Sequence, residues 1–235
     1  MKMTTEEAFV KVLQMHGIEH AFGIIGSAMM PISDLFPTAG IHFWDAAHEC
    51  NAGMMADGYT RSTGKMSMMV AQNGPGITNF VTPVKTAYWN HTPLLLVTPQ
   101  AANKTIGQGG FQEVEQMALF KDMVAYQEEV RDPARIAETL NRVILQAKRA
   151  SAPAQINVPR DFWTQVIDIE LPAIVEFERP DRRRGRHRGR SEDAVRGGIP
   201  GHAERCRRCH RRRHRRVDET GRASRRPGLL RLPAQ

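Results

Sequence analysis

The sequence predicts an α/β fold of the doubly wound class, built on a mainly parallel β-sheet. Short apolar runs typical of buried strands recur along residues 1–180 and alternate with segments whose apolar residues have helical spacing. Every Phe, Trp and Tyr of the chain also lies before Pro180. Because these side chains supply much of a hydrophobic core, we expect one folded domain over residues 1–180.

The first half of this domain is predicted to contain three helices and two strands. Thr4 or Thr5 can cap the first helix, and Gly17 stands after its end. Its apolar face comprises Ala8, Phe9, Val12 and Leu13. A strand at 20–24, a helix at 29–36, a strand at 41–46 and a helix at 49–62 follow in that order.

The second half continues the alternation of strands and helices. It is predicted to contain a strand at 66–72, a helix at 77–88 that includes Pro83, and a strand at 94–98. Asp132 and Pro133 have the order of a helix cap and first turn, and the helix that they open carries a regular apolar face. A strand at 154–158 completes the series.

Polar and glycine-rich segments follow several of the expected strands. In parallel sheets, functional residues gather beyond the carboxyl ends of the strands. The segments that leave those ends here are residues 26–27, 47–49, 73–76 and 99–100. We therefore expect these four loops to meet at one edge of the sheet and to form the candidate site.

Residues 181–235 differ sharply from the rest of the chain. They hold 19 arginines, no lysine and six acidic residues, so they carry +13 of formal charge, whereas residues 1–180 carry −5. Without aromatic residues this tail is expected to be disordered. One interpretation is an arginine-rich arm that binds nucleic acid. We favour a second interpretation, in which the tail is the out-of-frame translation of GC-rich DNA, because it combines Arg, Gly, Ala, Pro and His.

The cysteines predict neither a disulfide framework nor a metal site. Cys206, Cys209 and His210 have the spacing of a haem-attachment motif, and His214 adds a fourth candidate zinc ligand. No apolar pattern surrounds them to build a scaffold. Cys50 stands alone, which indicates a reducing, cytoplasmic setting. No apolar run approaches the roughly 20 residues of a membrane span, and no signal-peptide core is present.

Four motifs, in the same order, resemble the N-terminal pyrimidine-binding domain of thiamine-diphosphate-dependent enzymes. They occupy residues 48–49, 56–65, 73–79 and 110–113, and the resemblance runs from about residue 4 to residue 161. Residues 23–30, 45–51 and 71–76 are more similar to sulfoacetaldehyde acetyltransferases than to acetolactate synthases. The latter tend to have a Pro-Gly-Gly turn at the first of these places and a Ser or Thr before Gly-Pro-Gly at the third.

The resemblance implies a catalytic role for Glu49. In the family, a carboxyl group hydrogen-bonds ring nitrogen N1' of the cofactor and favours the imino tautomer that takes the C2 proton. Glu49 matches it at a strand-to-helix junction among small apolar residues. The alternative is an ordinary acidic residue that interacts with the dipole of a helix start.

The same resemblance implies further site residues. Those expected to contact the cofactor are Gly26, Asn73, Gly74, Gly76 and Gln112. Those expected to contact a small-molecule substrate are Ser27, His48 and Phe111. No metal ligand is expected in this chain, because the Gly-Asp-Gly motif that holds the diphosphate through Mg²⁺ in the family is absent from the sequence.

By resemblance, the Mg²⁺ and diphosphate site belongs to a separate C-terminal domain, and the family forms homodimers or homotetramers. We therefore expect this chain to be a truncated and inactive form of an enzyme that converts sulfoacetaldehyde and phosphate to acetyl phosphate and sulfite. An acetolactate synthase-like carboligase is the nearer alternative. A non-catalytic protein that binds nucleic acid through its basic tail is the alternative from another class.

Overall fold

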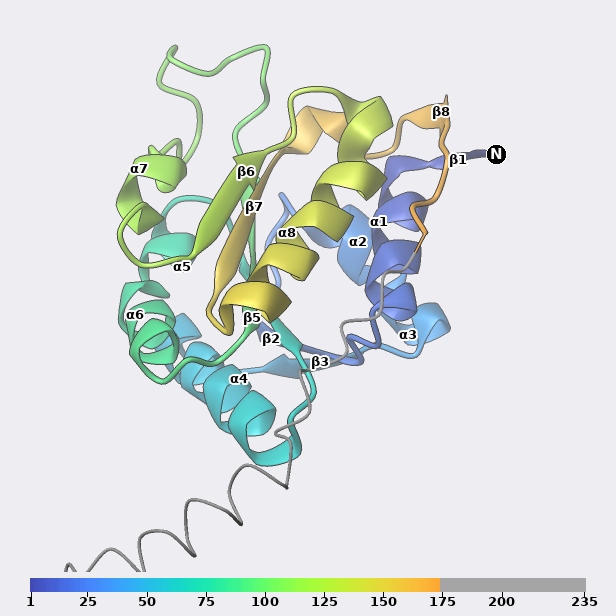
Figure 1. Ribbon diagram of the computed structural model, residues 1–235. Helices are drawn as coiled ribbons and strands as arrows, with labels where there is room; N and C mark the ends of the chain where they lie inside the picture. Colours follow the sequence, from blue (N-terminus) through green and yellow to red (C-terminus); the bar gives the residue numbers. More distant parts are fainter. Residues whose placement is uncertain (174–235) are drawn as a thin grey trace, which may run out of the picture. The chain divides into compact units, whose positions relative to one another are not determined.

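Six parallel strands form the central sheet of the computed structural model, which describes residues 1–173 (Figure 1). Their order across the sheet is β3-β2-β4-β5-β7-β6. The strands are β2 (His20–Ile24), β3 (His42–Asp45), β4 (Ser67–Ala71), β5 (Leu94–Gln100), β6 (Tyr126–Glu129) and β7 (Ala154–Pro159). The predicted tail, residues 181–235, lies outside the described residues.

Helices cover both faces of this sheet, which confirms the predicted doubly wound α/β class (Figure 1). One face packs against α1 (Thr5–Met15), α2 (Met30–Ser33), α3 (Phe36–Ala39) and α8 (Ile136–Ala150). The other packs against α4 (Glu49–Thr63), α5 (Pro75–Thr78), α6 (Val81–Trp89) and α7 (Gln116–Phe120). The 3₁₀ turns η1 (Pro133–Arg135) and η2 (Arg160–Phe162) precede α8 and follow β7.

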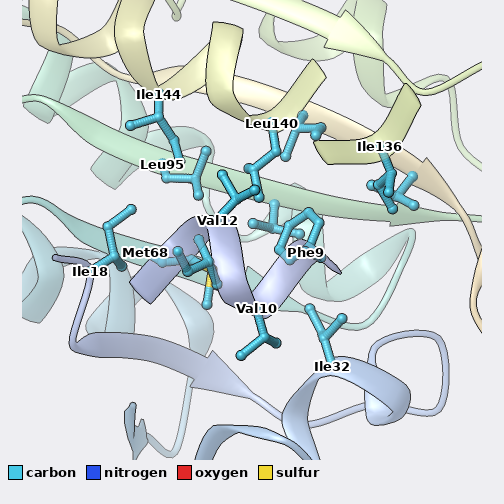
Figure 2. Packing of buried hydrophobic residues seen from close by; sticks show 14 of the residues in the cluster. Phe9, Val10, Val12, Ile18, Ile32, Met68, Leu95, Ile136, Leu140 and Ile144 are labelled. Carbon is cyan, nitrogen blue, oxygen red and sulfur yellow. The ribbon is translucent and has the colours of Figure 1, made fainter. Parts of the chain in front are cut away.

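The central strands β4, β5 and β7 are buried on both faces, which explains why most of their residues are apolar. Met68 and Val70 of β4 join the core under α1 and α8, whereas Met69 and Ala71 join the core under α4 and α6. Figure 2 shows Met68 and Leu95 of the sheet facing side chains of α1 and α8. The methionines at 66, 68 and 69 are therefore core residues.

Several helix boundaries follow from their capping residues. Thr4 caps α1 in a capping box, in which its hydroxyl accepts from the Glu7 amide and the Glu7 carboxylate accepts from the Thr4 amide. Gly64 ends α4 with a left-handed φ of 75°, which glycine adopts without strain. Asp132 caps η1 through Oδ1, which accepts from the Ala134 amide at 2.9 Å.

Two predicted helices are each divided into two short ones. The segment 29–36 forms α2 and the start of α3, and the segment 77–88 forms the end of α5 and most of α6. Pro37 and Pro83 cause these breaks, since a proline has no N–H for the hydrogen bond inside a helix. Each of them lies in the first turn of the second helix, where that N–H is not needed.

Four elements have no counterpart in the prediction. β1 (Lys2–Thr4) pairs with β8 (Val166–Asp168) in a two-stranded antiparallel sheet of its own. The short α7 follows a long loop, and the edge strand β6 reads Tyr-Gln-Glu-Glu, which has no apolar alternation.

Within residues 1–173, no helix is long and apolar enough to cross a membrane.

The chain changes direction across the sheet at β2. From β2 it passes through α2 and α3 to β3 on one side, and then through α4 to β4 on the other side of β2. The loops that follow β2 and β4 therefore leave toward opposite faces of the sheet. Such a switch point is where open α/β sheets bind their ligands.

Candidate functional site

Three loops and the start of α4 meet at this switch point. The loop after β2 contacts the loop after β4 through a hydrogen bond from the Ala28 amide to Gln72. The loop after β4 contacts the long loop after β5 through Gln112. Residues 99–100, predicted to lie in a loop, are instead the last two residues of β5. The predicted convergence of loops on one edge is otherwise observed.

Glu49, the first residue of α4, is half-buried at this edge. Its Oε2 accepts a hydrogen bond of 2.9 Å from Asn79 Nδ2. Its Oε1 lies beside Gly76, where an added Cβ would stand only 3.1 Å away. The carboxyl group is therefore held in one orientation between α4 and α5, with one oxygen already paired and the other next to bare backbone.

His48 caps the helix that Glu49 opens. Its Nδ1 accepts from the Cys50 amide at 3.1 Å, while the residue itself is exposed. Because Nδ1 is the acceptor, the neutral ring carries its proton on Nε2. His48 therefore has a defined structural role, and its exposed position leaves it accessible to a ligand.

The glycines of the candidate site permit contacts between protein segments. A Cβ at Gly74, whose φ is 71°, would lie 2.4 Å from the Gln112 carbonyl oxygen. A Cβ at Gly26 would lie 2.3 Å from Gln72 Oε1. Both positions therefore require glycine because another loop of this chain fills the space. Gly76 is different, since its neighbours include the Glu49 carboxyl group.

Asn73 is buried, with 3% of its surface exposed. Its Nδ2 donates to the carbonyl oxygens of Phe111 and Gln112, at 3.2 and 3.1 Å. The side chain that we expected to contact the cofactor thus ties the loop after β4 to the loop after β5. This is a structural task that the sequence pattern does not reveal.

The remaining predicted residues lie on the outer side of the same edge. Phe111 is 74% exposed, and Ser27 is also exposed. Gln112 adopts a left-handed φ of 55°, and its Oε1 accepts from Gln72 Nε2 at 3.0 Å. The loop that carries Phe111 and Gln112 is braced by Glu113, whose carboxylate accepts from the amides of Gly107 and Gly110.

Sequence reasoning missed three contributors to this site, which are Gln72, Asn79 and Glu113. Asn79 and Glu113 lie within the motifs at 73–79 and 110–113, so their positions were visible without their partners. Gln72 lies within the segment 71–76, but the pattern could not show its contact with Ala28, which depends on how closely the loops after β2 and β4 approach each other.

The groups whose pKa values are shifted, which include His16, Lys148 and Glu138, lie away from this edge. Desolvation lowers the pKa of His16, although the hydrogen bond that its Nε2 donates to Asn141 Oδ1 opposes this, and the charge of Lys148 lowers the pKa further. Burial likewise lowers the pKa of Lys148. Among residues 1–173, no group of three or more His, Cys, Asp or Glu side chains could hold a metal ion.

The geometry fits one side of a flat heteroaromatic ring. Glu49 offers a fixed carboxyl group beside the side-chain-free backbone of Gly76, and a ring nitrogen can hydrogen-bond such a group. Residues 3–119 match the family described as thiamine pyrophosphate enzyme, N-terminal TPP binding domain. This domain belongs to the thiamine pyrophosphate enzymes. The resemblance stated on the motifs is thus confirmed, and Glu49 and Asn79 lie within the matched segment.

The relatives of this thiamine pyrophosphate enzyme domain agree with the finer resemblance. It is 86% identical over 180 residues to a sulfoacetaldehyde acetyltransferase of Roseovarius nubinhibens, and 80% identical over 180 residues to a probable sulfoacetaldehyde acetyltransferase of Rhizobium meliloti. A probable acetolactate synthase large subunit of Methanocaldococcus jannaschii is 34% identical over 180 residues. The matches with the two acetyltransferases each cover 77% of this chain but only 30% of the relative. The match with the acetolactate synthase covers 74% of this chain and 30% of that relative.

Proposed function

We propose that this domain supplies the pyrimidine side of a thiamine-diphosphate-dependent sulfoacetaldehyde acetyltransferase. The reaction takes sulfoacetaldehyde and phosphate to acetyl phosphate and sulfite. The observation that carries the proposal is the Glu49 carboxyl group, held by Asn79 beside Gly76 at the switch point of a thiamine pyrophosphate enzyme domain. The 86% identity to an enzyme named for this reaction supports the choice of substrate.

When bound, thiamine diphosphate would supply the carbanion chemistry of the reaction at its C2 atom. The task of this chain is to orient the pyrimidine ring and to hold a proton near its nitrogen. Glu49 places the proton, and Asn79 fixes the carboxyl group that carries it. Gly26, Asn73, Gly74, Gly76 and Gln112 form the wall on the cofactor side, in which Asn73 acts through the loop that it holds. Ser27, His48 and Phe111 lie exposed at the edge open to substrate.

The diphosphate and Mg²⁺ are proposed to bind in a further domain, since the sequence has no Gly-Asp-Gly motif. The active enzyme is proposed to be a homodimer or homotetramer in the cytoplasm. Two observations support the division of this chain into residues 1–180 and 181–235. The matches with the acetyltransferases extend over 180 residues, and all the aromatic residues precede Pro180.

A chimera tests the proposal. The segment of the Roseovarius nubinhibens enzyme that matches this chain is replaced by the corresponding residues of this chain. The chimera is then incubated with sulfoacetaldehyde, phosphate, thiamine diphosphate and Mg²⁺. We expect sulfite and acetyl phosphate in equal amounts. A folded chimera that binds the cofactor but releases no sulfite contradicts the proposal, and acetolactate formed from pyruvate would favour the acetolactate synthase alternative.

A further inference from the structure

Three side-chain amides form a continuous network at the switch point. Gln72 lies between the other two and bonds to both Asn73 and Gln112. These three side chains, termed the amide relay, join the loops that follow β2, β4 and β5. An amide can donate from its nitrogen or accept at its oxygen, so the function of the relay depends on which end each member presents.

Backbone groups fix the orientation of two of the three side-chain amides, those of Gln72 and Asn73. The Ala28 amide can only donate, and it donates to Gln72 Oε1 at 3.1 Å. The carbonyl oxygens of Phe111 and Gln112 can only accept, and both accept from Asn73 Nδ2. Neither Gln72 nor Asn73 can be turned over without placing like groups against each other.

The orientation of the Gln112 side-chain amide follows from the orientations of Gln72 and Asn73. Gln72 Nε2 must donate, and it does so to Asn73 Oδ1 at 2.6 Å and to Gln112 Oε1 at 3.0 Å. The carbonyl end of Gln112 is therefore occupied. Its Nε2 has no hydrogen-bond partner among residues 1–173 and is not one of the buried unpaired atoms there, so this NH₂ group reaches solvent.

The relay is preformed because its surroundings leave little freedom. Gln72 lies against Gly26, where any side chain would collide with it at 2.3 Å. Gln112 is held by its own backbone carbonyl, which bonds to Asn73 Nδ2. A donor that is already oriented before a ligand arrives loses less entropy on binding than a free side chain does.

We propose that Gln72 is a positioning residue that turns the Gln112 carboxamide so that its NH₂ group faces the open edge and donates to an oxygen of the substrate's sulfonate. The inference rests on the proposed function. Sulfonate oxygens only accept hydrogen bonds, so they pair with an NH₂ group and are repelled by a carbonyl oxygen. Without Gln72, the Gln112 amide is free to present either end.

The first test is a double-mutant cycle in the active chimera. Gln112→Met is expected to raise the KM for sulfoacetaldehyde about 10-fold, the scale of one hydrogen bond to a charged group. Gln72→Met is expected to raise it about 3-fold, because half or more of the Gln112 orientations become unproductive. The double variant should equal Gln112→Met, since Gln72 acts through Gln112. The KM for phosphate should stay unchanged in all three.

Gln108→Met is the matched control, because Gln108 lies exposed on the same loop and should leave every KM unchanged. Effects of Gln72→Met and Gln112→Met that simply multiply in the double variant would mean that Gln72 acts independently of Gln112. That outcome overturns the proposal. An unchanged KM for sulfoacetaldehyde in Gln112→Met does so as well.

A second measurement separates this inference from the proposed function. In the present 235-residue chain, the side-chain NH₂ resonances of Gln112 are identified by their loss in Gln112→Met and titrated with 2-hydroxyethanesulfonate. We expect them to shift, and to shift less in Gln72→Met. An inactive chimera with this response rejects the proposed reaction and keeps the relay. An absent response, or an equal one in Gln72→Met, rejects the relay whatever the activity.

Discussion

Asn79, the residue that follows α5, fixes the orientation of the Glu49 carboxyl group. Its Nδ2 donates to Oε2 at 2.9 Å. Oε1 is the oxygen beside Gly76, where an added Cβ would also stand 3.2 Å from the Ala71 Cβ. This one hydrogen bond therefore orients the carboxyl group that is proposed to face the pyrimidine ring.

Replacing this acid by its amide tests the catalytic role. In the chimera, Glu49→Gln keeps the size of the side chain and an acceptor for Asn79 but has no acidic proton. Hydrogen–deuterium exchange at C2 of the bound cofactor should slow by about 10²–10⁴, the usual scale of acid–base catalysis. Thermal unfolding should be unchanged. Near-normal exchange would instead support the alternative in which Glu49 only interacts with the helix dipole.

A substitution at Gly76 tests whether the position of the Glu49 carboxyl group matters for activity. The Cβ of Gly76→Ala would lie 3.1 Å from Glu49 Oε1 and 3.2 Å from the Ala71 Cβ, so the carboxyl group must move. We expect kcat of the chimera to fall about 10-fold, because small misplacements of reacting groups have large effects on rate. The matched control is Gly58→Ala in α4, where the Cβ meets open space. An equal loss of activity in both variants would exclude a specific effect on Glu49.

At the level of residues, the sequence was most informative where a motif carries chemistry. Glu49 and Gln112 were predicted as site residues because their neighbours match a family pattern. The pattern could not show that Asn73 is buried and serves the next loop, nor that Gln72 holds that loop from the other side. Both facts depend on distances between loops that are far apart in the chain.

Arg142 of α8 connects this helix to β6 through hydrogen bonds. Arg142 donates to both carboxylate oxygens of Glu128, at 2.8 and 2.7 Å, and to Glu138 at 2.8 Å. Hydrogen bonding from Arg142 lowers the pKa of Glu128 despite partial burial. Hydrogen bonds first from Arg135 and then from Arg142 lower the pKa of Glu138 to about 2. An edge strand of four polar residues is thereby attached to an amphipathic helix.

This arrangement predicts a pH-dependent contribution to stability. Arg142→Met should lower the free energy of unfolding by about 1 kcal/mol at pH 7, the upper range for a partly exposed ion pair. Because the carboxylate pKa values are lowered in the folded state, the contribution is present above the ordinary value of 4.5 and is lost as the pH falls toward the lowered values. Denaturant titrations of both proteins should therefore converge in acid. A difference that stays undiminished between pH 7 and pH 2 would indicate lost packing of the Arg142 stem instead.

The elements found from sequence are those whose burial leaves a pattern. β4 and β5 are covered on both faces and are therefore largely apolar, with apolar runs at 68–71 and 94–97. β6 lies at the edge and is held by Arg142, so its sequence has no strand signal. The divided helices show the opposite error. Their apolar spacing continues across a break that a proline in the first turn of the second helix causes.

At the level of the whole molecule, the described residues form only one side of the proposed cofactor site. We predict that the 235-residue chain alone shows no saturable binding of thiamine diphosphate at micromolar concentrations in a calorimetric titration. The diphosphate is the strongest electrostatic contact of such a cofactor, and Glu49 and its neighbours do not provide it. Adding Mg²⁺ should change nothing. Tight, Mg²⁺-dependent binding would reveal a phosphate site in this chain.

The origin of residues 181–235 can be tested on the encoding DNA. If the tail is an out-of-frame product, one of the other two reading frames downstream of the Pro180 codon should continue into a further domain with a Gly-Asp-Gly segment. Stop codons shortly after Pro180 in both other frames, with the arginine-rich frame retained in independent isolates, would exclude this origin. The arginine-rich arm would then be the remaining interpretation, and salt-sensitive binding of nucleic acid would test it.

The small sheet of β1 and β8 brings the two ends of the described fold together. Lys2 pairs with Asp168, and the Ile169 amide bonds to the Met1 carbonyl oxygen at 3.0 Å (Figure 1). A module whose first and last strands are neighbours can be exchanged between multidomain proteins during evolution without separating the segments on either side of it. The same closure makes the domain a candidate for circular permutation, with a short linker across β1 and β8 and new termini in an exposed loop.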